Sequence, residues 1–167
     1  LPDLPDHMNP GSTQAKNVFP AVNSYRPFNA ISNTSSNALD ARAQGGRAFK
    51  SDSGVVSIFA GDATKLYRLV ANSFVDESGG TTFATASEGY WDFVRFGEKV
   101  IAFNGIDAPQ EWTLDTSSDF SALSGSPPIF RHAAVINNFV VTGFQTAAQN
   151  KVAWSSFNDA TSWTAGV

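Results

Sequence analysis

Short runs of alternating hydrophobic and polar residues follow one another along most of the chain after residue 37. Residues 55–60 (VVSIFA), 65–70 (KLYRLV) and 99–104 (KVIAFN) are rich in β-branched and aromatic residues, and turn-forming residues separate these runs. A period of two is typical of strands that bury one face, and clusters of Gly, Asn and Asp mark the turns between them. The pattern therefore predicts an all-β protein of antiparallel strands. Further strands are predicted at residues 81–85, 110–114, 139–144 and 151–157, and a hairpin turn with positive φ is predicted at Asn137 and Asn138.

The order of these runs repeats along the chain. Phe59 and Tyr67 in the first copy correspond to Phe103 and Trp112 in the second, at an offset of about 44 residues. A third copy follows at a similar offset and places Trp154 at the position of Trp112. A repeat of about 40–45 residues with four strands in each copy is typical of β-propeller blades. The repeat therefore predicts a partial β-propeller of four-stranded blades.

The predicted organisation is an extended N-terminal arm over residues 1–37, followed by about three blades at 38–86, 87–126 and 127–167. The last blade is expected to be truncated at the C-terminus, because the chain stops within a β-type run. A propeller needs about four to eight blades, so closure would require further sequence or another chain. A generic antiparallel sandwich is the alternative fold.

The repeat also assigns structural roles to individual residues. Large residues at recurring positions are expected to form the core between neighbouring blades: Phe59, Tyr67, Phe103, Trp112, Trp154 and Trp163. Aspartates that follow strands are expected to cap tight turns with their carboxylates, in preference to catalysis or calcium binding: Asp62, Asp107 and Asp159.

The N-terminal residues have a different composition from the repeats. Three X-Pro steps fall within residues 1–10, and such steps enforce extended or turn geometry. Residues 17–27 (NVFPAVNSYRP) continue as an aromatic-bearing segment that could lie across a partner or across the chain's own domain. The candidate partner-contact residues are Val18, Phe19, Tyr25, Arg26 and Phe28.

Composition excludes several classes of function. The chain has 167 residues, 16% of them charged, and a net charge of −4, which argues against a basic surface wrapped around nucleic acid. It has no cysteine, so disulfides and thiolate metal sites are excluded. No apolar run approaches the roughly 18 residues that span a bilayer, so no membrane segment is expected.

The sequence offers little that could support catalysis. His7 and His132 are the only histidines. His7 lies beside Asp3 and Asp6, where a solvated loop is favoured over a weak metal site, and His132 lies in an apolar strand, where packing is favoured over catalysis. No nucleophile elbow, phosphate-binding loop or dinucleotide fingerprint is present. Four arginines occupy unrelated positions of the repeat and so do not suggest a sialidase-like cluster: Arg26, Arg68, Arg95 and Arg131. The sequence therefore predicts a protein that is not an enzyme, with no cofactor and no metal.

Three segments together resemble the structural proteins of bacteriophages: residues 1–28, residues 95–114 (RFGEKVIAFNGIDAPQEWTL) and residues 150–166 (NKVAWSSFNDATSWTAG). The similarity is to the tail hub, or nozzle, proteins of short-tailed phages. These proteins resemble one another in an arm that carries Pro and Asn before a YRP-like segment, here residues 23–27. Blades with a GxxVIAxNGxDxPxxW-like pattern follow, here at residues 97–112.

This resemblance implies a virion protein that forms a ring of six identical subunits in the phage tail, in the head-to-tail connector region. The ring would lie below the portal and the adaptor, extend the DNA-exit channel and help to gate DNA ejection. The implied partners are other copies of the chain, the portal and adaptor, further tail proteins, and phage DNA that passes without sequence-specific binding. A carbohydrate-binding or glycosidase-like propeller, such as a receptor-binding tail protein, is the alternative, and a generic interaction propeller is a third.

Overall fold

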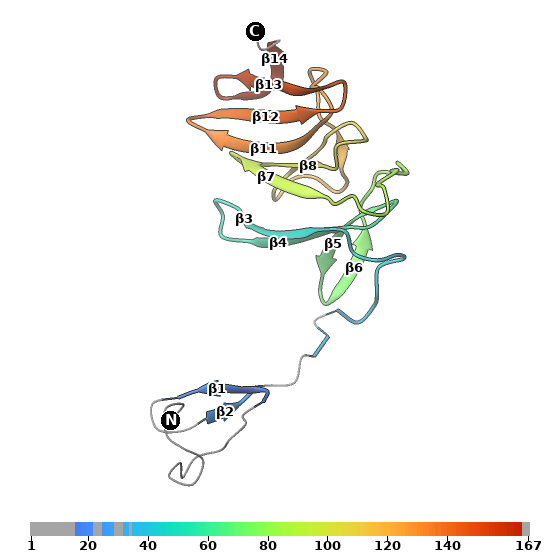
Figure 1. Cartoon of the computed structure of the whole chain (residues 1–167), viewed down its shortest axis with the longest axis vertical. Coiled ribbons are helices and arrows are strands. Elements are labelled where there is room, and N and C mark those ends of the chain that lie inside the picture. Colours follow the sequence, from blue (N-terminus) through green and yellow to red (C-terminus); the bar gives the residue numbers. More distant parts are fainter. Residues whose placement is uncertain (1–15, 22–24, 29–31, 34, 165–167) are drawn as a thin grey trace, which may run out of the picture. The chain divides into compact units, whose positions relative to one another are not determined.

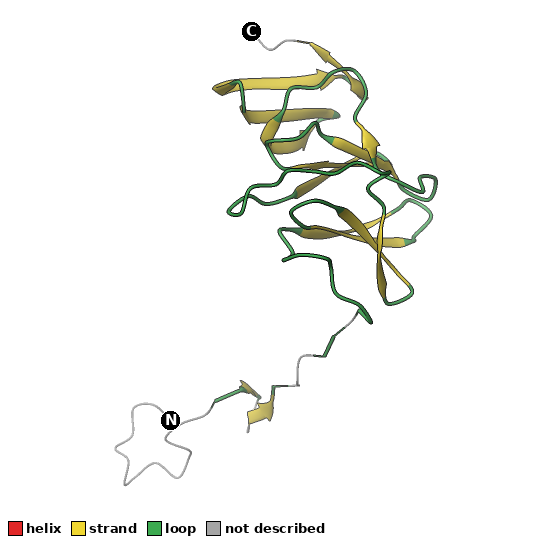
Figure 2. Cartoon of the chain, turned by 90° about the vertical axis from the view of Figure 1, so that its right-hand side faces the viewer, coloured by secondary structure: helices red, strands yellow, loops and turns green. Residues whose placement is uncertain are grey.

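The computed structural model describes residues 16–21, 25–28, 32–33 and 35–164. All regular secondary structure in these ranges is β-strand, and no helix occurs in them (Figure 2). Contacts divide the chain into two compact units, Leu1–Thr34 and Ser35–Val167, and each is described by itself. The predicted all-β class is confirmed.

The second unit contains three four-stranded antiparallel sheets, and in each the strands follow one another in chain order (Figure 1). The first sheet comprises β3 (Gly46–Lys50), β4 (Val56–Gly61), β5 (Leu66–Val70) and β6 (Ser73–Asp76). The second comprises β7 (Asp92–Phe96), β8 (Lys99–Phe103), β9 (Gln110–Thr113) and β10 (Ser121–Ala122). The third comprises β11 (Phe130–Ile136), β12 (Phe139–Gln145), β13 (Ala148–Ser156) and β14 (Asp159–Thr164).

The first strands of the three sheets lie side by side, because β7 contacts both β3 and β11 (Figure 1). Arginines join two of these edges. The guanidinium of Arg47 on β3 donates to the backbone oxygen of Phe93 on β7, at 2.7 Å. In the other direction, Arg95 on β7 donates to the backbone oxygen of Lys50 on β3. These bonds satisfy backbone carbonyls on strand edges that no ladder partner covers.

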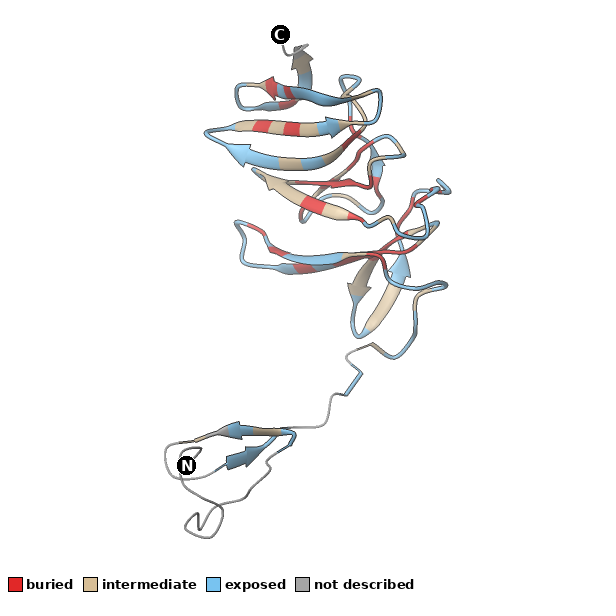
Figure 3. Ribbon diagram, in the orientation of Figure 1, coloured by how far each residue is buried: buried red, intermediate tan, exposed pale blue. Residues whose placement is uncertain are grey.

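The middle sheet is buried on both faces. Along β8, Val100 and Ala102 belong to a core cluster shared with the first sheet, whereas Ile101 and Phe103 belong to a cluster shared with the third. Successive side chains of a strand point to opposite faces, so this alternation places one core on each side of β8. Figure 3 shows β8 as buried, in contrast to long exposed stretches of β3 and β11.

Each sheet therefore has two distinct faces. We call the face toward the preceding sheet in the chain the leading face, and the face toward the following sheet the trailing face. In the second sheet, Val100 and Trp112 lie on the leading face and Phe103 lies on the trailing face. In the first sheet, Phe59 lies on the trailing face, and the alternation of β4 places Ile58 on the leading face. Each contact between sheets thus joins a trailing face to a leading face.

Turn geometry confirms one sequence prediction and overturns another. Asn137 and Asn138 have φ of 44° and 65° in the hairpin between β11 and β12, as the prediction of positive φ requires. The first sheet is different from the prediction. Ala71 and Asn72 also have positive φ and form a hairpin that makes β6 the fourth strand. Residues 81–85, predicted to be that strand, lie in a loop.

The first unit contains a two-stranded antiparallel sheet, and its strands are β1 (Val18–Pro20) and β2 (Tyr25–Pro27). The backbone N–H of Phe28 donates to the oxygen of Asn17, at 2.7 Å, and extends the pairing by one step. The segment predicted to be extended therefore folds back on itself as a hairpin.

The boundary between the units lies slightly earlier than residue 37. The side chain of Asn37 exchanges two hydrogen bonds with the backbone of Phe74 on β6, both of 2.8 Å. The backbone N–H of Ser36 donates to the oxygen of Asn72. Both residues were predicted to belong to the arm, yet their hydrogen bonds attach them to the first sheet.

Candidate functional site

Asp62 caps the turn between β4 and β5 from a fully buried position. Its Oδ1 accepts the backbone N–H groups of Thr64 and Lys65, both at 2.8 Å. Its Oδ2 accepts the backbone N–H of Ala41 at 3.1 Å and the hydroxyl of Tyr67 at 2.8 Å. One carboxylate therefore closes the turn and attaches the segment before β3 to the sheet.

The hydrogen bonds determine how this pair titrates. Burial by itself raises the pKa of Asp62, but the donors from Thr64, Tyr67, Lys65 and Ala41 outweigh it and hold that pKa below the usual 3.8. Burial and the hydrogen bond to Asp62 raise the pKa of Tyr67 to about 12. At neutral pH the pair is thus a carboxylate bound to a phenol, which is an arrangement for structure and not for proton transfer.

Asn104 occupies the corresponding place in the second sheet. Its Oδ1 accepts the backbone N–H groups of Ile106 and Asp107, at 2.9 and 2.8 Å, which is the pattern that Asp62 makes with Oδ1. The prediction assigned this cap to Asp107. The structure corrects it: the Oδ2 of Asp107 accepts the backbone N–H of Ala84 at 2.9 Å, so Asp107 attaches the turn to the loop before β7.

Asp159 lies at the start of β14. Its Oδ1 accepts the backbone N–H and the hydroxyl of Thr161, at 2.8 and 2.7 Å. The side-chain and backbone hydrogen bonds from Thr161 lower the pKa of Asp159. Unlike the caps at Asp62 and Asn104, this one lies in an exposed hairpin.

Four of the six residues predicted for the core lie in contacts between sheets. Phe59 packs on Trp112 between the first and second sheets, with ring centroids 5.3 Å apart. Phe103 packs on Phe130 between the second and third, at 4.9 Å. Trp163 is half-buried and lies 6.1 Å from Phe130 on the same cluster.

Tyr67 is buried, but not between sheets. It pairs with Ala60 on β4, whereas the neighbouring pair Phe59–Arg68 points toward the second sheet. Tyr67 therefore lies on the leading face of the first sheet, where the backbone N–H of Asp40 donates to its hydroxyl oxygen at 3.3 Å. The prediction of an inter-blade role for Tyr67 is wrong within the described residues, because the segment before β3 covers it.

Trp154 is also misplaced by the prediction. It is 39% exposed and pairs with Val141, whereas Trp112 pairs with Val100 on the leading face of the second sheet. The buried neighbour Val140 points toward the second sheet, so Val141 and Trp154 lie on the trailing face of the third sheet. The sequence alignment of the third copy was shifted by one residue, and such a shift moves a side chain to the opposite face.

A partly buried ion pair that the sequence reasoning missed lies between the first two sheets. The Nη2 of Arg68 lies 3.0 Å from the Oε1 of Glu77, and the guanidinium lies 5.1 Å from the ring centre of Trp112. The backbone oxygen of Glu77 accepts the N–H of Phe120 at 2.7 Å. Burial raises the pKa of Glu77 even though the charge of Arg68 lowers it.

The hairpin of the first unit presents most of its predicted contact residues to solvent. Tyr25 is 62% exposed, and Phe19, Arg26 and Phe28 are also exposed. Val18 is half-buried. Phe19 and Phe28 stack with ring centroids 4.9 Å apart and form one aromatic surface on the hairpin, whereas Tyr25 pairs with Pro20 and lies on its opposite face.

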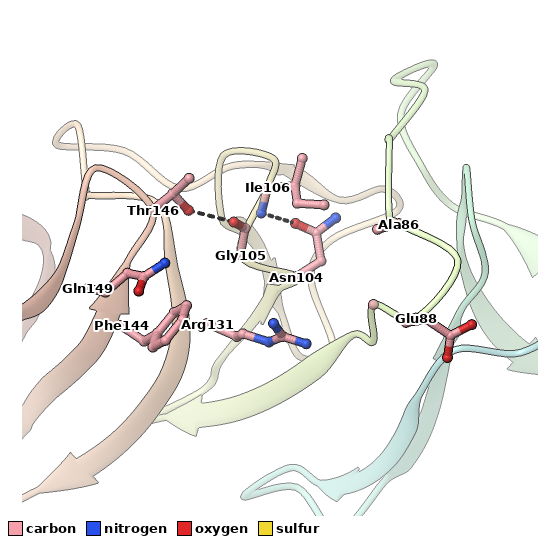
Figure 4. A pocket seen from close by; sticks show the side chains of 10 residues that line it. Ala86, Glu88, Asn104, Gly105, Ile106, Arg131, Phe144, Thr146 and Gln149 are labelled. Atoms are coloured by element: carbon pink, nitrogen blue, oxygen red, sulfur yellow. Dashed lines mark hydrogen bonds between the residues drawn. The ribbon is translucent and has the colours of Figure 1, made fainter.

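A shallow hollow of about 230 Å³ lies between the second and third sheets (Figure 4). The loop before β7, the turn after β8 and strands β11 to β13 supply its lining. The hydroxyl of Thr146 donates to the backbone oxygen of Gly105 at 2.5 Å and joins the two turns. Arg131 stacks on Tyr90 at 5.1 Å, and the carboxylate of Glu88 points away from Arg131 in Figure 4.

This hollow has few groups that could perform chemistry. Glu88 is the one carboxylate among its described lining residues, whereas glycoside hydrolysis generally uses two. The described ranges contain no group of three or more His, Asp or Glu side chains placed to hold a metal ion. Arg131 and Gln149 could instead donate hydrogen bonds to a polar ligand.

No protein-family model matches the chain, and no curated protein matches it either. Within the part of the chain that the structure describes, no helix is long and apolar enough to cross a membrane.

Proposed function

We propose that this chain is a structural, non-enzymatic protein of a phage virion, and that it forms part of a hub or nozzle ring in the tail. In this proposal its role is mechanical: it holds neighbouring tail proteins in place and extends the channel through which DNA leaves. The ring would lie below the portal and the adaptor and contain six copies of the chain. The sequence resemblance motivates the identity, and the surfaces of the structure support an assembly role.

The aromatic surface of the N-terminal hairpin is the observation that carries the proposal. An isolated two-stranded hairpin is marginally stable in water. Here its aromatic side chains are exposed within their own unit, and Tyr25 exposes 62% of its surface. Exposed aromatic clusters with a nearby Arg are typical of the residues that dominate binding energy at protein interfaces. Arg26 supplies that cation.

We further propose that the three sheets are blades of a β-propeller. Three observations support this arrangement: each sheet is a four-stranded antiparallel meander, the first strands lie side by side, and the middle sheet is buried on both faces. Blades stacked around an axis have these properties, because each blade buries its faces only against its neighbours.

A net charge of −4 fits a channel component that DNA passes without binding. DNA carries dense negative charge, and a protein that holds it tightly does so with clustered Lys and Arg. A weakly acidic subunit offers little attraction to a moving polyanion.

The proposal is tested by locating the protein in particles of the phage that encodes it. Antibody labelling of purified virions should mark the junction between head and tail, and particles made without the protein should lose DNA or lack the distal tail. Labelling of the tail fibres, or intact particles in the absence of the protein, would contradict the proposal.

Carbohydrate binding is the second candidate, and the hollow that contains Arg131 favours it. Arg131, stacked on Tyr90, could bind a polar ring ligand, as donors and aromatic faces do in small-molecule sites. A glycan array separates the two functions. Binding that is lost in Arg131→Ala, but retained in the matched surface variant Arg42→Ala, would favour the receptor-binding function over the hub.

A further inference from the structure

We infer that the hollow between the second and third sheets binds an acidic sugar, whose carboxylate pairs with Arg131 and whose ring packs on Phe144. The inference rests on the carbohydrate candidate above and specifies its ligand, and it does not depend on the tail role. An arginine without a partner, an aromatic residue in a strained conformation and the size of the hollow support it.

Arg131 differs from the other arginines of residues 35–164. Each of the others donates a hydrogen bond to a backbone oxygen or a carboxylate of the chain: Arg42, Arg47, Arg68 and Arg95. Arg131 donates none to the described residues and forms no ion pair with them, and the carboxylate of Glu88 points away from it (Figure 4). The N–H donors of its guanidinium are therefore available to a ligand.

The side chain of Arg131 is nevertheless held in place from two sides. Its guanidinium lies 5.1 Å from the ring centre of Tyr90. At Gly105, which has a φ of +78°, an added Cβ would lie 3.2 Å from the Cβ of Arg131 and 3.4 Å from its Cγ. The turn after β8 thus packs closely on the base of this side chain. A side chain that is already positioned loses less conformational entropy when a ligand binds.

Phe144 lies in an irregular part of β12 that lines the same hollow (Figure 4). The register between β12 and β13 shifts between Gly143 and Gln145, and Phe144 has a φ of 54°. This left-handed conformation is uncommon for a residue other than Gly or Asn. Bulges redirect side chains, and strained residues cluster at binding sites. Phe144 is 39% exposed, so its ring offers an apolar surface to a ligand.

The chemistry of the lining favours a carboxylate over a phosphate. A guanidinium matches the two oxygens of a carboxylate with two parallel hydrogen bonds. Phosphate groups are typically bound by clusters of arginine or by backbone N–H groups, whereas Arg131 is the one cation among the described lining residues. The amide of Gln149 can donate hydrogen bonds to hydroxyl groups and accept hydrogen bonds from them.

The size of the hollow limits the ligand to one ring. Its volume is about 230 Å³, below the roughly 300–1,000 Å³ of sites for drug-sized ligands. A hexuronic acid is a single ring with several hydroxyl groups and one carboxylate. It therefore fits the charge, the apolar surface and the volume of this site together.

The test titrates the purified chain with four sugars in ligand-observed NMR. Glucuronate and galacturonate are the acidic probes, and glucose and galactose are their neutral counterparts with the same rings. The acidic sugars should bind about tenfold more tightly or better, which is the scale of a hydrogen bond to a charged group. Acetate, a carboxylate without a ring, should bind at least about tenfold more weakly than either hexuronate.

Four variants assign the binding to the hollow. Arg131→Gln should weaken hexuronate binding about tenfold or more and leave the neutral sugars unchanged. Arg131→Lys keeps the charge without the planar fork and should lose part of this affinity. Phe144→Asn removes the ring at a φ that Asn tolerates, so it should weaken acidic and neutral sugars alike. Arg26→Gln, at an exposed arginine of the first unit, is the matched control and should change nothing.

The possible failures can be told apart. Equal binding of acidic and neutral sugars would overturn the inference and leave the carbohydrate candidate intact, whereas binding of none of the four would overturn both. Acetate that binds as tightly as the hexuronates would indicate a site for small anions and overturn the role of the ring. Hexuronate binding that survives Arg131→Gln would place the ligand elsewhere on the chain, which also overturns the inference.

Discussion

At the scale of single residues, the structure is organised by polar side chains that close turns between apolar strands. Asp62 and Asn104 follow the second strand of their sheets and bind the same two backbone N–H positions in the turn. They differ in the other terminal atom of the side chain. The Oδ2 of Asp62 accepts two further hydrogen bonds, whereas the Nδ2 of Asn104 donates hydrogen bonds to Thr85 and Asp107.

This difference predicts a graded result at position 62. Asp62→Asn keeps the turn cap but replaces an acceptor with a donor opposite the N–H of Ala41, so the free energy of unfolding should fall by about 1–2 kcal/mol. Asp62→Ala leaves four donors without their acceptor and should lower it by about 3 kcal/mol or more. Urea unfolding measures both. The exposed cap variant Asp159→Ala should lower it by less than about 1 kcal/mol, and equal losses at the two sites would contradict this account.

Glu77 predicts an unusual pH dependence. Its pKa is raised above 4.5 in the folded state, so the folded protein holds this proton more tightly than the unfolded chain does. The contribution of Glu77 to stability should therefore fall as the pH rises from 4.5 through the raised pKa. Relative to Glu77→Gln, the wild type should become less stable between pH 4 and pH 7 in urea unfolding. A relative gain in that window would mean that Arg68 dominates and lowers the pKa.

The pKa shift of Asp62 has the opposite sign to that of Glu77, so Asp62 serves as the internal comparison. Its pKa is below 3.8 in the folded state, so its contribution is present above pH 3.8 and is lost as the pH falls through the folded value. The difference in unfolding free energy between the wild type and Asp62→Asn should shrink in acid for this reason.

The sequence predicted that polar side chains cap these turns, but it was less successful in predicting which residue forms each cap. Asp62 could be recognised because it follows a strong strand and precedes a short turn. Asn104 was passed over in favour of Asp107, since both lie in one turn and the choice depends on backbone geometry. The sequence comparison placed Trp154 at the position of Trp112, which is one residue away from its place in the structure. Alignment of a repeat of variable length cannot resolve such a shift, and a shift of one residue moves a side chain to the opposite face of the sheet.

At the scale of elements, hairpins and the loops between sheets determine which strands pair. The sequence identified the second and third strands of each sheet, because their apolar runs are strong. It failed at the fourth strand of the first sheet. Phe83 is buried and T-stacked on Trp91 at 5.0 Å, so residues 81–85 look like a strand although they lie in a loop. Burial of an aromatic residue does not by itself determine strand pairing.

Gly125 lies in the loop that leads from the second sheet to the third. We expect that adding a single methyl group at this position strongly destabilises the fold. Its φ is +85°, and a Cβ there would lie 1.6 Å from the backbone oxygen of Thr161. Gly125→Ala should therefore separate this loop from the β13–β14 hairpin and lower the free energy of unfolding by about 3 kcal/mol. Thermal unfolding should detect this as a fall in Tm of several degrees.

Gly80 is the matched control for this substitution. Its φ is +78°, and no atom of the described residues lies within 4 Å of the position of an added Cβ. Gly80→Ala should therefore lower the free energy of unfolding by only about 1 kcal/mol, the effect of left-handed backbone alone. Equal losses in the two variants would show that steric contact with Thr161 is unimportant.

At the scale of the whole molecule, the period of the sequence was sufficient to predict three similar sheets in chain order. It could not predict which sheet faces remain exposed, because that depends on which residues of each strand point to which face of the sheet. The hairpin at residues 18–27 was also missed, since Pro20 and Pro27 favour extended backbone without indicating that two such segments pair.

The proposed tail role predicts that hairpin variants separate assembly from folding. Tyr25 and Phe28 are exposed, so replacing both with Ser should change the unfolding of the sheets by less than about 0.5 kcal/mol. Incorporation into virions, measured by mass spectrometry of purified particles, should fall at least tenfold. Ile106→Ser, at an exposed apolar position in a turn of the second unit, is the control and should assemble normally.

Cryo-electron microscopy of tailed particles that contain this protein tests the central claim most directly. The account predicts six-fold density below the portal and adaptor, in which each subunit contains stacked four-stranded sheets around a common axis, with the N-terminal hairpin in contact with a neighbouring protein. Absence of the chain from the connector region, or its presence as a separate monomer at the distal end of a fibre with the Arg131 hollow facing outward, would contradict the account.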